Sequence, residues 1–392
     1  MEESVLNNTE TVLLGLLRRA LFGQPFVIET TEVDWAQLYQ EARAHTVQLL
    51  LYDAMTGQEL DSMPLSLANM WRSDALQILQ RNLLLLREQE NILNILRKSN
   101  IPVTVFKGSA CADNYPRPEM RCFGDIDLLV SKANIHLAQQ LLKEQGYTKR
   151  KEACPWHVAL QRDKYVVELH FAVSGIPDGV VGERLVQYLQ SLPQLDICQQ
   201  AVALLLHKLN HLRKDGLGLR QLCDWALFVQ KWIDEESWTQ LKPRLESFGL
   251  LHFAKVITRL CVEYLSLPEQ AASWCMDADQ ILTADLLHDI LQTGNFGSKQ
   301  QRLGQKLFTD GGSGGRIMSL WRTSLYACKV NWPACKEHPF LLPVAPCVLL
   351  FRYWKQRKSY LRPPLRLWKS FRLAKSRQKL YQALRPFEIN LI

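Results

Sequence analysis

Hydrophobic and polar positions follow two different periods along the chain, and the change between them divides the sequence into three parts. Apolar residues recur every three or four positions over 8–22, 33–46 and 65–98, which predicts helices. Alternating positions then predict strands over 102–106, 125–130, 147–151, 156–161 and 165–171, with one helix at 133–145, capped by Ser131 and ended by Gly146. The helical period returns from Asp196, with helices expected at 201–212 and 219–232.

This succession predicts an α+β protein with a small mixed-sheet core between helical N-terminal and C-terminal regions. We expect five segments: a helical region 1–98, an α/β core 99–175, a helical domain 176–303, a Gly-rich linker 304–316 and a helical, basic region 317–392. The linker assignment rests on the Gly and Ser residues around 309–315.

The positive charge of the chain belongs to its last segment. The 392 residues carry a formal net charge of +8, but residues 351–392 hold 12 Lys and Arg against one acid. The remaining 350 residues hold 35 Lys and Arg against 38 acids. The nearly neutral body argues against a core coated with nucleic acid. What the basic tail binds has to be considered separately from the chemistry of the body.

The chain start and the cysteines favour a cytoplasmic protein. Met1-Glu2-Glu3-Ser4 is not the start of a secretory signal. The ten cysteines form no Cys-x-x-Cys pair, and we find no His/Cys spacing typical of zinc, so reduced thiols are expected. The apolar run Pro339–Phe351 is too short to span a bilayer.

Three acids in the β-rich part are candidates for a metal site. Asp125 and Asp127 are two apart on one expected strand, so their side chains share a face. Glu168 lies inside the β-branched run 165–171 and shares its face with His170. An acid there is costly without a partner, and adjacent carboxylates are tolerated mainly around a cation. Oxygen ligands of this kind suit Mg²⁺ or Mn²⁺.

Basic and small residues near these acids are candidates for phosphate binding. Lys107-Gly108-Ser109 ends the first strand in a turn that could offer backbone N–H groups to a phosphate, although a plain strand-to-helix turn has the same pattern. Arg121 either binds phosphate or pairs with Glu119. His207 and His211 share a helix face with three possible roles: zinc ligation without an evident third ligand, substrate contact, or packing.

Together these motifs resemble the polymerase-β-like nucleotidyltransferase superfamily. Phe106-Lys107-Gly108, Arg121-x-x-x-Asp125-Ile126-Asp127 and Glu168-Leu169-His170 resemble more closely a bacterial nucleotidyltransferase family, with His207, His211 and the run Leu219–Asp224 in further agreement. The resemblance covers about residues 100–230. The gap between Ser109 and Asp125 is longer than is usual in the superfamily.

The resemblance implies metal-dependent transfer of a nucleoside monophosphate from an NTP to an acceptor hydroxyl. Asp125, Asp127 and Glu168 would hold two metal ions and carry the catalysis. Lys107, Gly108, Ser109, Arg121 and Lys208 would contact the nucleotide phosphates, and His170, His207 and His211 would contact substrate. Asp224 would be a packing or supporting acid.

Other functions fit the sequence less well. Glycosyltransferases with an Asp-x-Asp carry a larger nucleotide-binding unit before it, and haloacid-type phosphatases need a Thr soon after it, where this chain has Leu128, Leu129 and Val130. A non-catalytic nucleotide-binding or scaffold protein is a further alternative, which the intact acids argue against. Aromatic residues between the cations of the tail suit an anionic membrane at the inner face, single-stranded nucleic acid, or packing on the body.

Overall fold

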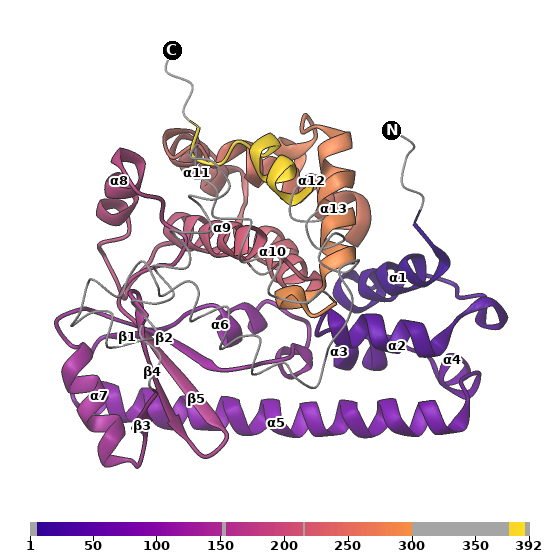
Figure 1. The fold of residues 1–392 in the computed structure, drawn as a ribbon, viewed down its shortest axis with the longest axis horizontal. Coiled ribbons are helices and arrows are strands. Elements are labelled where there is room, and N and C mark those ends of the chain that lie inside the picture. The colour runs from indigo at the N-terminus through magenta and orange to yellow at the C-terminus, as the bar shows by residue number, and fades with distance from the viewer. Residues whose placement is uncertain (1–5, 151–153, 215, 300–375, 389–392) are drawn as a thin grey trace, which may run out of the picture.

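The computed structural model describes residues 6–150, 154–214, 216–299 and 376–388. Figure 1 shows a five-stranded sheet flanked by one long helix on one side and by a group of helices on the other. The predicted α+β class is confirmed.

The N-terminal helices surround the start of the longest helix. They are α1 (Asn8–Phe22), α2 (Trp35–Ala44), α3 (Gln48–Ala54), α4 (Gly57–Asp61) and α5 (Leu65–Lys98). The predicted helix 65–98 has the observed bounds of α5, because leucine and isoleucine keep a helical period over its whole length. Neither α3 nor α4 was predicted, since a helix of five to seven residues is too short to show a period.

The sheet contains β1 (Val103–Val105), β2 (Ile126–Val130), β3 (Thr148–Lys149), β4 (His157–Arg162) and β5 (Tyr165–His170) in the order β1-β2-β5-β4-β3. Of the four pairs of neighbouring strands in this sheet, β2–β5 is parallel and the other three are antiparallel. This parallel pair lies at the centre of the sheet, and its register sets Asp127 opposite Glu168.

Two short helices connect the strands. The helix α6 (Gly108–Ala112) follows β1, and α7 (Ile135–Glu144) follows β2. The predicted cap at Ser131 is wrong, because α7 begins at Ile135 after a turn in which Asn134 N–H donates to the Ser131 carbonyl. The predicted end at Gly146 is confirmed by a φ of 84°, a conformation that glycine adopts without strain.

The C-terminal helices cover the other side of the sheet. They are α8 (Val180–Tyr188), α9 (Ile197–Lys214), α10 (Leu219–Trp232), α11 (Glu235–Ser247), α12 (Leu251–Leu265) and α13 (Gln280–Thr293). Residues 376–383 are also helical. In Figure 1, α9 and α10 lie over the sheet on the side away from α5.

Two hydrophobic cores hold these layers together. One lies between the sheet, α7 and the second half of α5, and includes Leu93, Leu128 and Leu169. The other joins the N-terminal helices to the helices after the sheet, and Phe106 and Leu129 connect it to the sheet. The helical segments before and after the sheet therefore bury their apolar faces against each other.

The predicted linker 304–316 and most of the region 317–392 lie outside the described residues, as does the run Pro339–Phe351. Of the basic tail the structure describes 376–388, where Leu380 and Leu384 are buried and Arg377 lies 3.1 Å from Asp289 of α13. Within the described parts, no helix combines the length and the apolar character needed to cross a bilayer.

Candidate functional site

Three carboxylates meet at the centre of the sheet. Asp127 lies on β2, Asp125 precedes that strand by one residue, and Glu168 pairs with Asp127 in the parallel β2–β5 ladder. One oxygen of each lies within 4.8 Å of the other two. Alternation along β2 therefore puts both aspartates on one face, as the sequence predicted, and the register of β5 adds the glutamate.

Lys107 joins the carboxylates from the end of β1. Its ammonium nitrogen lies 3.3 Å from Asp127 Oδ1, and its side chain is 12% exposed. The backbone of Lys107 has a φ of 53°, where a residue with a side chain is strained. A Cβ at the next residue, Gly108, would lie 3.5 Å from Asp127 Oδ2. The turn thus approaches the carboxylate closely, and the glycine leaves the space beside it open.

Two histidines flank Glu168. His170 Nε2 lies 2.8 Å from Asp127 Oδ1 and 3.1 Å from Glu168 Oε2, while His157 Nδ1 lies 3.4 Å from that same glutamate oxygen. His157 and His170 are opposite each other in the β4–β5 ladder. The sequence placed His170 beside Glu168 but missed His157, whose only signal was its place at the start of the preceding strand.

The electrostatics of the three acids favour a bound cation. Burial, together with the neighbouring Asp127 and Glu168, raises the pKa of Asp125 to about 7. Burial also acts to raise the pKa of Asp127, but Lys107 and His170 outweigh it and hold that pKa below its ordinary value. The protein thus leaves the charge of Asp125 less compensated than that of Asp127, and the carboxylate oxygens around it fit a divalent metal ion.

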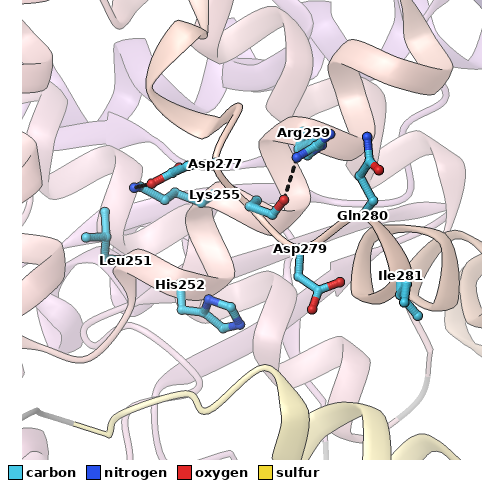
Figure 2. Close-up of a pocket in the computed structure, with 9 residues that line it drawn as sticks. Leu251, His252, Lys255, Arg259, Asp277, Asp279, Gln280 and Ile281 are labelled. Carbon is cyan, nitrogen blue, oxygen red and sulfur yellow. Dashed lines mark hydrogen bonds and ion pairs between the residues drawn. The ribbon is translucent and has the colours of Figure 1, made fainter.

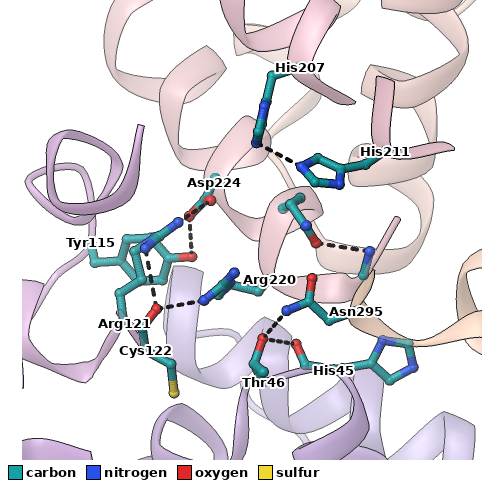
Figure 3. A network of polar contacts seen from close by, with 12 residues as sticks. His45, Thr46, Tyr115, Arg121, Cys122, His207, His211, Arg220, Asp224 and Asn295 are labelled. Atoms are coloured by element: carbon teal, nitrogen blue, oxygen red, sulfur yellow. Dashed lines mark hydrogen bonds and ion pairs between the residues drawn. The ribbon is translucent and has the colours of Figure 1, made fainter. Parts of the chain in front are cut away.

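The loop that leads into Asp125 is tied to α10 by a buried ion pair (Figure 3). Arg121 donates from Nε and Nη2 to the two oxygens of Asp224, both at 2.7 Å. The Tyr115 hydroxyl donates to the same carboxylate at 2.9 Å. Burial alone would raise the pKa of Asp224, but Arg121 keeps it below its ordinary value.

The predicted alternative in which Arg121 pairs with Glu119 is wrong. Arg117 pairs with Glu119 instead, with its Nε 3.3 Å from the Glu119 carboxylate. Two further residues hold the loop. Asn82 of α5 donates to the Arg121 carbonyl at 2.9 Å, and Arg220 of α10 donates to the Cys122 carbonyl at 2.9 Å.

A cavity of about 220 Å³ lies between the carboxylates and the helices α9 and α10. Lys208 of α9 and Arg220 of α10 line it together with Lys107 and the three acids. Lys208 is 2% exposed, its ammonium lies 5.4 Å from the centroid of the Trp225 ring, and burial lowers its pKa. Cations from several separate segments of the chain therefore surround the three acids in this cavity.

His207 and His211 line the same cavity and contact each other. Their Nε2 atoms are 3.0 Å apart, and the His211 ring packs on Phe296. Burial first, and then Lys107 and His211, hold the pKa of His207 well below its ordinary value, so this imidazole is neutral at pH 7. Neither histidine belongs to a metal-binding cluster in the described part of the chain, so the zinc interpretation gains no support.

Ser109 makes contacts that differ from those of its neighbours Lys107 and Gly108. The Ser109 hydroxyl is buried and donates to Gln89 Oε1 of α5. The structure therefore brings Lys107 and Gly108 to the acids and engages Ser109 with the long helix, so its predicted phosphate contact stays a prediction.

A second cavity, of about 390 Å³, borders the first, since Lys107, Cys111 and Leu204 line both. Most of its other walls are apolar, and they include Val103, Val105, Phe106, Leu129, Phe228 and Trp232. The Trp232 indole nitrogen donates to Asn114 Oδ1 at 2.9 Å, which fixes the ring in the wall of the cavity.

The part of the chain that contains the acidic cluster matches a known family. The model of a family described as an uncharacterised nucleotidyltransferase matches residues 31–266, which include both the sheet and the helices that line the cavity. The chain belongs to this nucleotidyltransferase family. No curated protein and no solved structure matches the chain.

A third depression lies apart from the acids, between α12 and α13, and measures about 740 Å³ (Figure 2). Its cations are already engaged: Lys255 lies 2.6 Å from Asp277, and Arg259 donates to the Ala278 carbonyl at 2.5 Å. Both clusters of described residues that could hold a metal ion lie at the sheet instead.

Proposed function

We propose that this protein transfers a nucleoside monophosphate from an NTP to an acceptor hydroxyl, with pyrophosphate as the leaving group. The observation that carries the proposal is the approach of Asp125, Asp127 and Glu168 to within 4.8 Å of one another, beside a cavity that Lys107, Lys208 and Arg220 also line. Membership of a nucleotidyltransferase family supports it.

The three carboxylates are proposed to hold Mg²⁺ or Mn²⁺. Bound there, the metal would supply positive charge for the triphosphate and for the attacking and leaving oxygens. The raised pKa of Asp125 supports this assignment, because an added cation relieves the repulsion that raises it.

Three cations from different elements are proposed to bind the phosphates. Lys107 follows β1, Lys208 lies on α9 and Arg220 lies on α10, and all line the cavity that contains the acids. Cations held by a rigid frame position the triphosphate and balance charge that moves to the leaving pyrophosphate. Lys208 has no room to turn to solvent, since it is 2% exposed.

Glu168 is proposed to accept the proton of the acceptor hydroxyl. It is 21% exposed, more than Asp127 at 7%, so a second substrate can reach it. His170 contacts both carboxylates and would hold them in place during the transfer. The acceptor would then enter from the β4–β5 side of the cluster.

The nucleoside is proposed to occupy the 390 Å³ cavity on the opposite side. The order of the strands places β1 and Lys107 on one side of Asp127 and Glu168 on the other. A triphosphate that contacts Lys107 would lead its nucleoside into the bordering cavity, where Trp232 offers a ring for stacking. Mostly apolar walls with a few polar groups are typical of small-molecule sites.

The transfer can be tested with two labelled forms of each NTP. The protein would be incubated with Mg²⁺ and a small-molecule and protein extract, with label on the α-phosphorus or on the γ-phosphorus. Nucleotidyl transfer puts the α-label, and not the γ-label, into an acceptor, and Asp127→Asn abolishes the labelling. Transfer of the γ-label instead would contradict the proposal, because it indicates a kinase.

A further inference from the structure

We propose that His157, Glu168 and His170 form a second metal site, with Cys154 as a further ligand, and that this site prefers Zn²⁺ to Mg²⁺. The site shares only Glu168 with the three carboxylates described above. It requires no nucleotide, so it can exist whether or not the protein transfers nucleotides.

The spacing of the ligand atoms fits one tetrahedral ion. Metal–ligand bonds of about 2.0–2.3 Å place neighbouring ligand atoms about 3.3–3.6 Å apart. His157 Nδ1 lies 3.4 Å from Glu168 Oε2 and 3.4 Å from Cys154 Sγ. His170 Nε2 lies 3.1 Å from the same Glu168 oxygen. Three neighbouring pairs therefore have separations close to the edges of a single coordination tetrahedron.

The kinds of donor atom decide the class of metal. Two imidazoles, a thiol and a carboxylate are the ligands that Zn²⁺ prefers, whereas Mg²⁺ takes oxygen ligands almost exclusively. Asp125 and Asp127 offer only oxygens, so the sheet presents two neighbouring positions with different preferences. Glu168, between them, could bridge both.

The sheet holds the nitrogen and oxygen ligands rigidly. His157 and His170 face each other in the β4–β5 ladder, and their ring centroids are 4.9 Å apart. His170 is 2% exposed, while His157 is 15% and Glu168 21% exposed, so a metal can enter from the His157 side. Cys154 is half-buried three residues before His157. The sequence showed no zinc spacing because the set combines two short pairs, Cys154 with His157 and Glu168 with His170, which are eleven or more residues apart.

Metal binding without nucleotide tests the site. The full chain, freed of metal by a chelator, would be titrated with Zn²⁺ in a large excess of Mg²⁺ and followed by calorimetry and elemental analysis. We expect one tightly held Zn²⁺ per chain. His157→Gln should weaken Zn²⁺ binding by about 100-fold or more, since loss of even an outer partner of a metal ligand costs about 10–100-fold. The matched control, His136→Gln, changes an exposed histidine on α7 and should bind as the wild type does.

Cobalt supplies a second measurement that reports on the thiol. Co²⁺ in the wild type should give the intense visible bands of a tetrahedral ion and a thiolate charge-transfer band, and Cys154→Ser should remove only the latter. Equal Zn²⁺ binding by the wild type and His157→Gln would overturn the proposal, as would displacement of Zn²⁺ by Mg²⁺; the four side chains would then form a hydrogen-bonded network only. Zn²⁺ binding by a protein that binds no NTP would support the site while contradicting the proposed transfer.

Discussion

Arg121 and Asp224 form a buried bidentate ion pair, with both nitrogen–oxygen distances at 2.7 Å, between the loop that precedes Asp125 and the helix α10. Both side chains are at most 6% exposed. Since α10 also supplies Arg220 to the cavity, this pair fixes the acids of the sheet relative to the cations of the helices. The arrangement of the site therefore depends on a contact between two parts of the fold.

The first prediction concerns this ion pair. Asp224→Asn should lower the free energy of unfolding by about 3–5 kcal/mol, because it leaves the Arg121 charge buried and uncompensated. Urea denaturation measures the change. Asp53→Asn is the matched control: Asp53 contacts Arg117 at 2.6 Å, but both side chains are about a third or more exposed, so the loss should be at most about 1 kcal/mol. Equal losses in the two variants would show that the buried pair does not hold the fold.

The second prediction is the pH dependence of the same pair. Burial acts to raise the pKa of Asp224, but Arg121 outweighs it and lowers that pKa in the folded protein. The pair therefore stabilises the fold fully above the ordinary carboxyl pKa of about 4, and the stabilisation is lost as the pH falls towards the lower folded value. The difference in unfolding free energy between the wild type and Asp224→Asn should be constant from pH 7 to pH 5 and shrink below about pH 4. A difference that grows on acidification has the wrong sign for this account.

The third prediction concerns Lys208. Lys208→Met keeps the length of the buried side chain and removes its charge, so the fold should persist. If its ammonium binds phosphate, the Kd for Mg·NTP should rise by about tenfold to 100-fold, the value of a hydrogen bond to a charged group. Calorimetry measures the affinity, and Lys164→Met, which removes a charge from an exposed residue, is the control. An unchanged Kd in Lys208→Met rules out the phosphate contact.

The fourth prediction separates the nucleoside from its phosphates. Trp232→Ala should weaken NTP binding by about 1–3 kcal/mol, the value of stacking a base on an aromatic ring. It should leave the binding of inorganic tripolyphosphate with Mg²⁺ unchanged, because that ligand has no base to stack on the Trp232 ring. Parallel losses for both ligands would place the nucleoside elsewhere.

Local patterns were enough to predict the acidic cluster. The alternation of Asp125, Ile126 and Asp127 fixes one face of a strand, and the apolar neighbours of Glu168 mark an acid that needs a partner. The long helix α5 was predicted to the residue for the same reason, since its period repeats over nine turns of sequence.

The remaining features depend on contacts between distant segments. Arg121 and Asp224 are 103 residues apart, and no local pattern selects one aspartate on α10 as the partner of one arginine. His157 comes to Glu168 through the register of β4 on β5, which is set by packing across the whole sheet. The Ser131 cap failed because a turn intervenes before α7, and the sequence allows either start.

The most direct test of the account is Mg²⁺-dependent NTP binding, measured by calorimetry on the full chain, on Asp125→Asn/Asp127→Asn and on the control Asp163→Asn, which changes an acid in the β4–β5 turn. We predict that the wild type and the control bind an NTP only when Mg²⁺ is present. The double variant should stay folded and lose this Mg²⁺-dependent binding of NTP. Wild-type protein that binds no NTP in the presence of Mg²⁺, or a double variant that binds as tightly as the wild type, would contradict the assignment of these acids as the metal-binding centre of a nucleotidyltransferase.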